Sequence, residues 1–144
     1  MDRNEQDTQH SEHLRRAKLF LEQAGADLKE AQRHLRKGAA LESGYLSLQA
    51  AMNAMSALAH AHGDYRLPSH SPARLAQHLC DGPLALAPDD EAGRTPWLDP
   101  AAALEAVQMR GPFDATRDPA AEKAEAAAHL EYAGALLKLV KKAL

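Results

Sequence analysis

Residues 43–58 read SGYLSLQAAMNAMSAL, and this stretch decides the fold of the chain. In and around it, apolar residues recur at spacings of four and three, which places them in one stripe along an α-helix. The stripe consists of Leu41, Tyr45, Leu48, Met52, Met55, Ala59 and His62. Four alanines widen it without bulk, so neighbouring helices can approach closely. They are Ala50, Ala51, Ala54 and Ala57. We therefore predict the central helix of a bundle, buried on more than one side.

Composition agrees with an all-α chain built around one core. The 144 residues are enough for one domain, and 45% of them are hydrophobic while only 4% are aromatic. This alanine-rich mixture suits close helix packing better than a sheet of aromatic and β-branched residues. A formal net charge of −3 argues against a protein whose whole surface binds nucleic acid, but it leaves room for a local basic patch.

The first residues and the single cysteine bear on the cellular setting. Residues 1–10 are polar and lack an apolar period, so we predict a flexible lead-in before one domain at 11–144. They contain no apolar run of a signal peptide, and no segment has the roughly 18 uncharged residues that span a bilayer. The single cysteine, Cys80, excludes an internal disulfide and disfavours a zinc–thiolate site. The expected location is cytoplasmic, without membrane contact.

Two long helices are predicted in the first half. The first is a long helix that begins after a cap at Ser11 and ends at Gly38, and the second runs from 39–42 to about His62. Its inner row is Leu14, Ala17, Leu21, Ala24, Leu28, Ala31 and Leu35. Because a short glycine-containing turn joins the two helices, they should form an antiparallel hairpin.

The second half is predicted to hold shorter elements and one final helix. Ser69 or Ser71 can cap a short third helix that starts near Pro72 and ends at 81–83. Residues 83–100 contain several prolines and an acidic triplet, which predicts a long irregular loop. A short helix at 101–109 follows, and the last helix begins at the cap Asp118. Its inner row is Ala126, Leu130, Ala133, Leu137, Val140 and Leu144.

The order of these elements and three local signatures resemble the HEPN domains. The first signature is Tyr45 followed by Gln-Ala-Ala at 49–51, and the second is Ser-His at 69–70 before a short leucine-bearing helix. The third, MRGPF at 109–113, is similar to the family's Arg-Tyr-Pro segment. The chain departs from the family at Met52 and Ser56, where many members have Glu and Lys. The resemblance implies a four- to five-helix up-down bundle, a homodimer, and a nucleotidyltransferase, an antitoxin or another defence component as partner.

The ribonuclease motif of that family, an arginine followed closely by a histidine, is absent where it would count. Arg110 and Arg117 precede the last helix, but the only histidine after them is the distant His129. We therefore predict a non-catalytic module that binds nucleotide or RNA. The alternative is an atypical ribonuclease in which one of these arginines meets a histidine brought near by folding.

A further alternative is an unrelated helical bundle that mediates protein interaction or binds metal, and the eight histidines invite the metal-binding interpretation. The ones considered are His60, His62, His70 and His78. His60 and His62 are two apart on a helix and point to different faces, whereas ligand pairs usually lie three or four apart. We predict no metal and no cofactor, and His70 is expected to hydrogen-bond backbone groups at the start of the third helix.

An up-down bundle would gather basic residues at one pole, where the first helix starts and the second and last helices end. The candidate ligand-binding residues are Arg15, Arg16, Tyr65, Arg66, Arg110, Lys138, Lys141 and Lys142. Such a patch can receive phosphates, with the tyrosine as a stacking surface. The structural alternative is that the lysines complement a helix dipole and that the charges keep the surface soluble.

Overall fold

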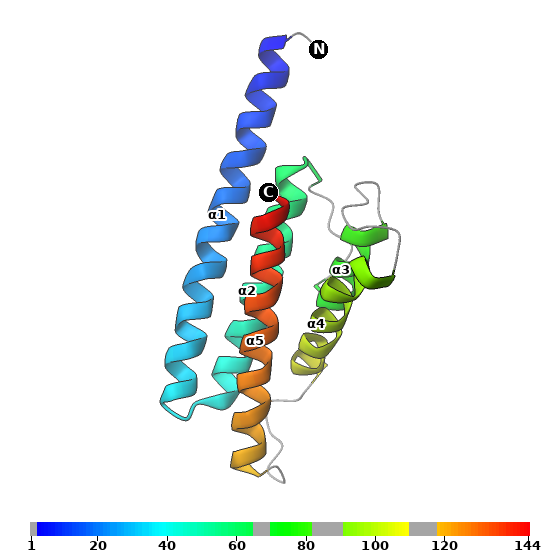
Figure 1. The fold of residues 1–144 in the computed structure, drawn as a ribbon. Coiled ribbons are helices and arrows are strands. Elements are labelled where there is room, and N and C mark those ends of the chain that lie inside the picture. The colour runs from blue at the N-terminus through cyan, green and yellow to red at the C-terminus, as the bar shows by residue number, and fades with distance from the viewer. Residues whose placement is uncertain (1–2, 65–69, 82–90, 110–117) are drawn as a thin grey trace.

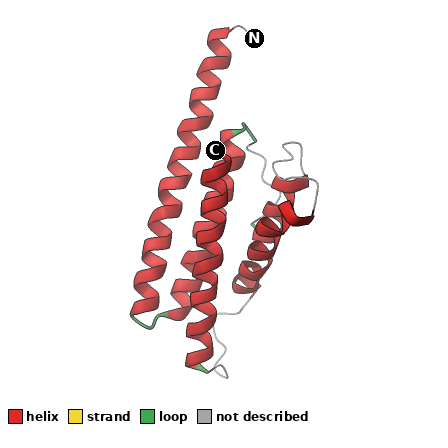
Figure 2. Ribbon diagram, viewed as in Figure 1, coloured by secondary structure: helices red, strands yellow, loops and turns green. Residues whose placement is uncertain are grey.

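The computed structural model describes residues 3–64, 70–81, 91–109 and 118–144, with the side chains of 107–109 left out. Within these ranges the chain forms five helices and no strand (Figures 1 and 2). They are α1 (Arg3–Arg36), α2 (Ala40–Ala61), α3 (Pro72–Asp81), α4 (Glu91–Met109) and α5 (Pro119–Ala143). The predicted all-α bundle is confirmed.

Helices α1 and α2 form the predicted antiparallel hairpin (Figure 1). Gly38 ends α1 with φ at +82°, in the left-handed region that favours glycine after a helix. The two helices approach closely because small residues line their contact. Ala24 and Ala54 are fully buried, and Ser43 Oγ donates a 2.8 Å hydrogen bond to the carbonyl oxygen of Ala31.

Helix α2 lies at the centre and contacts each of the other four helices. All four alanines of its quoted stretch are fully buried, as are Met55 and Leu58. Burial on more than one side is therefore confirmed. The ends of the predicted stripe are less enclosed, since Tyr45 is half-buried and His62 is exposed.

Helices α3 and α5 begin where the sequence predicts. Ser71 Oγ accepts a hydrogen bond from the backbone N–H of Arg74 (3.2 Å), and Asp118 Oδ1 accepts one from Ala120 (3.3 Å). The other cap candidate, Ser69, lies outside the described residues.

Both α3 and α5 contact α2 and α4, and Leu75, Leu79, Leu136 and Leu137 belong to the core. Two predicted inner-row residues are instead exposed, Leu14 (48%) at the start of its row and Leu144 (46%) at the end of its row.

The predicted start of the first helix is wrong, because α1 begins at Arg3 rather than after Ser11. Residues 3–11 are helical although all of them are exposed. Extending a helix that is already nucleated adds one hydrogen bond per residue fixed, which is far less costly than starting one. The packed part of α1 therefore supports the exposed part.

The predicted loop at 83–100 is also wrong over residues 91–100, which form the first half of α4. Residues 83–90 lie outside the described part of the chain. Pro96 and Pro100 are inside this helix, against their usual preference. The reason is packing: Trp97, Ala101 and Leu104 follow at spacings of four and three and are all buried in the core. An ion pair between Arg94 and Asp81 fastens the same segment to α3.

Candidate functional site

The amino-terminal half of α1 and the carboxyl-terminal ends of α2 and α5 lie at the same end of the bundle (Figure 1). Five of the predicted binding residues occur there, all of them exposed, and we call them the basic pole. They are Arg15, Arg16, Lys138, Lys141 and Lys142. The other three candidates, Tyr65, Arg66 and Arg110, lie outside the described residues.

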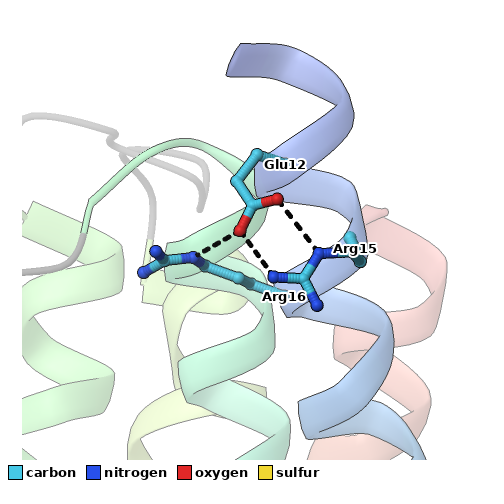
Figure 3. A network of polar contacts seen from close by, with 3 residues as sticks. All are labelled: Glu12, Arg15 and Arg16. Carbon is cyan, nitrogen blue, oxygen red and sulfur yellow. Dashed lines mark hydrogen bonds and ion pairs between the residues drawn. The ribbon is translucent and has the colours of Figure 1, made fainter. Parts of the chain in front are cut away.

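An acidic side chain that the sequence reasoning missed sits among these arginines. Glu12 accepts hydrogen bonds from Arg15 Nη2 (2.6 Å) and Nε (3.0 Å), and from Arg16 Nε at 3.2 Å (Figure 3). These bonds lower the pKa of Glu12 to about 2, and the bonds from Arg15 have the largest effect. Glu12 therefore stays ionised and offsets one of the two arginine charges, so most of the net positive charge of the pole comes from its three lysines on α5.

Histidines from three helices make separate contacts at or near the carboxyl-terminal end of α2, beside the basic pole. The ring of His13 on α1 lies against Gly63, and the ring of His60 on α2 stacks on Phe20 with centroids 4.7 Å apart. His78 on α3 forms a 2.7 Å contact between Nε2 and Asp64 Oδ2. This last pair ties α3 to the end of α2, and its members are 14 residues apart in sequence. Helical periodicity relates only neighbouring turns, so it gave no signal for this pair.

Burial lowers the pKa of His60, and the nearby charges of Arg16 and His13 lower it further. The opposite charge of Asp64 raises the pKa of His60, and its influence is smaller than those of burial and of Arg16. The imidazole of His60 is therefore held in its neutral form at the junction of α1 and α2.

Acidification is expected to destabilise this junction. Because the folded pKa of His60 lies below its ordinary 6.5, the unfolded chain takes up a proton more readily just below that pH. The stability from neutral His60 is thus complete above pH 6.5 and is lost as the pH falls through the folded pKa. Urea unfolding measures the free energy of unfolding at about pH 7.5 and about pH 5.5. The decrease between the two pH values should be smaller in His60→Gln than in the wild-type chain. An unchanged drop in the variant would show that other groups cause it.

Other candidate groups offer little chemistry. In the described ranges, no three His, Cys, Asp or Glu side chains are placed to hold a metal ion. Cys80 is buried in α3, and burial raises the pKa of its thiol. His129 is only 4% exposed on α5, which keeps it from an external RNA strand. The arginines of the ribonuclease alternative, Arg110 and Arg117, lie outside the described residues, and His70 is exposed.

A hollow of about 280 Å³ opens between α1 and α2 on the outside of the bundle. It is lined by Arg16, Leu19, Phe20, Gln23 and Asn53. Two of these lining residues share a partner: Asp27 accepts hydrogen bonds from the amides of Gln23 and Asn53, both at 2.8 Å. The bond from Asn53 joins α2 to α1, and no single-helix pattern could have revealed it, whereas Gln23 and Asp27 lie four residues apart within α1.

No family model, curated protein or solved structure matches this chain. The resemblance to HEPN domains therefore stays a prediction from the quoted signatures. None of the helices in the described ranges is both long enough and apolar enough to cross a membrane.

Proposed function

We propose that this chain is a cytoplasmic, non-catalytic, HEPN-like module that binds nucleotide or RNA at its basic pole. The supporting observation is that side chains from α1 and α5, far apart in sequence, present their positive charge at one end of the bundle. Exposed lysines on a rigid helix end suit phosphate groups, because their charge stays in water until the ligand arrives.

The proposal includes a homodimer that partners a nucleotidyltransferase, an antitoxin or another defence component. Support for the named partners comes from the resemblance to HEPN domains alone, and a fold does not by itself specify a function. The binding surface can be tested without knowing the partner.

The test measures fluorescence anisotropy of labelled single-stranded RNA, and separately of a labelled nucleotide, over a series of salt concentrations. Each phosphate contact contributes about 0.7 to the slope of log affinity against log salt for a single strand. The double variant Lys141→Gln/Lys142→Gln should therefore reduce the slope for RNA by about 1.4. The matched control Lys29→Gln/Lys37→Gln removes the same charge from exposed positions away from the pole and should leave the slope unchanged.

Equal losses in the two double variants, or no binding at low salt, would contradict the basic pole. RNA cleavage in the same reactions that persists through further purification would favour the ribonuclease alternative instead.

A further inference from the structure

Four residues of α1 share a helix face that lies outside the predicted inner row. Arg16, Leu19, Phe20 and Gln23 follow one another at spacings of three, one and three, so their side chains lie along two turns of one side. With Asn53 of α2 they line the hollow of about 280 Å³. The hollow thus has a cation at one end, an apolar wall and amides at the other end. Protein sites for small molecules combine an apolar wall with a few placed polar groups in this way.

The two amides are held in place by the protein itself. Gln23 Nε2 donates to Asp27 Oδ1 and Asn53 Nδ2 donates to Asp27 Oδ2, each at 2.8 Å. Because one carboxylate takes an N–H from each amide, both amides are oriented, and their carbonyl oxygens can accept a hydrogen bond from a ligand. Groups that are fixed beforehand lose less freedom on binding. This end of the hollow therefore suits a ligand group with an O–H or N–H donor.

The opposite end of the hollow suits an anion. Arg16 bonds Glu12 through Nε at 3.2 Å, and its two other guanidinium nitrogens point away from Glu12 (Figure 3). Glu12 is shared with Arg15, so one carboxylate faces two arginines and one positive charge is left over. A guanidinium edge binds a carboxylate through two parallel hydrogen bonds, which gives direction as well as attraction.

The wall between the two ends suits a flat apolar group. Leu19 is 54% exposed and Phe20 lies beside it, so apolar surface faces solvent inside the hollow. An aromatic ring can cover both side chains at once. Arg16 and Gln23 are two turns apart, about 10 Å along the helix axis, which a single ring with a short acid chain can span.

We propose that the α1–α2 hollow binds a small aromatic carboxylate with a hydroxyl or amino group at its far end. The carboxylate meets Arg16, and the ring lies against Leu19 and Phe20. The far donor meets the carbonyl oxygens of Gln23 and Asn53. This site shares only Arg16 with the basic pole and uses none of the α5 lysines, so it goes beyond the proposed function and is tested separately from RNA binding.

The first experiment titrates the isotope-labelled chain with para-coumarate and follows the side-chain amide signals of Gln23 and Asn53 by nuclear magnetic resonance. Both signals should shift and give one dissociation constant, of the order of 1 mM for so small a ligand. Two matched probes each lack one feature. Para-coumaramide has no negative charge and should bind about tenfold more weakly, and cinnamate has no hydroxyl and should bind about fivefold more weakly.

The second experiment tests the cationic end with exposed residues whose replacement should not disturb folding. Arg16→Gln should weaken the binding of para-coumarate about tenfold and leave that of para-coumaramide nearly unchanged, because the lost contact is to the carboxylate. Arg15→Gln is the matched control, since Arg15 also bonds Glu12 but does not line the hollow. It should leave both probes within about twofold of the wild-type chain. Far-ultraviolet circular dichroism checks that the helices are retained.

The outcomes separate this site from the basic pole. If para-coumarate at about 10 mM shifts neither amide signal, the site is overturned and RNA binding at the lysines is untouched. Equal losses in Arg16→Gln and Arg15→Gln would overturn the placement of the carboxylate, and equal affinities of para-coumarate and cinnamate would overturn the placement of the hydroxyl. Lys141→Gln/Lys142→Gln should leave para-coumarate binding unchanged, and a loss in that variant would mean that the probe binds the lysines instead.

Discussion

Replacing Trp97 with alanine is expected to lower the free energy of unfolding by about 3–5 kcal/mol. Trp97 is 6% exposed and belongs to the core cluster, although it lies in a segment with two prolines inside a helix. Its loss would remove a large apolar side chain and leave a cavity that α4 cannot readily fill, since Pro96 and Pro100 restrict the backbone on either side.

Urea unfolding followed by the far-ultraviolet dichroism of the helices measures this loss, because the substitution removes the only tryptophan. Trp97→Phe is the matched control and should cost clearly less, since it retains an apolar ring in the same place. A loss below about 1 kcal/mol for alanine would mean that the first half of α4 does not contribute to the core.

Replacing Gly63 with alanine is expected to cost more than the same change at Gly38. Both glycines have positive φ, +78° and +82°, so alanine at either position meets about 1–2 kcal/mol of backbone strain. At Gly38 nothing lies within 4 Å of the added methyl group, whereas at Gly63 the methyl would come within 2.8 Å of His13 Cε1. The side chain of His13 would have to move away from the end of α2.

Thermal or urea unfolding of the two variants gives the difference between them. In a His13→Ala background, Gly63→Ala should cost only about as much as Gly38→Ala, because the obstructing ring is gone. If Gly63→Ala lowers the free energy of unfolding no more than Gly38→Ala in the wild-type background, His13 does not lie in van der Waals contact with the end of α2.

Gly63 also shows how the chain is arranged beside the basic pole. Gly63 ends α2 and turns the chain so that Asp64 reaches His78, while its lack of a side chain lets His13 of α1 come close. The position of three helices relative to one another therefore depends on one residue without a Cβ atom. At this junction the end of α2 contacts His13 of α1, next to the basic pole, and His78 of α3.

Much of the fold follows from the sequence. The apolar period of residues 43–58 identified the central helix, and the glycines and caps located the ends of α2, α3 and α5, because these signals act within one or two turns of backbone. The gathering of Arg15, Arg16 and the α5 lysines at one end followed from the order of helices and their short connections.

Tertiary contacts decided the rest. Two helical segments differ from what local sequence signals predict. The start of α1 is helical because it continues from the packed part of the same helix. Residues 91–100 are helical because burial of Trp97 outweighs the unfavourable prolines. The Asp64–His78 pair and the Asn53–Asp27 hydrogen bond each join separate parts of the chain, and the hollow beside Leu19 is lined by both α1 and α2. Periodicity describes one helix at a time, so a contact between two helices becomes visible only when packing has set their relative positions.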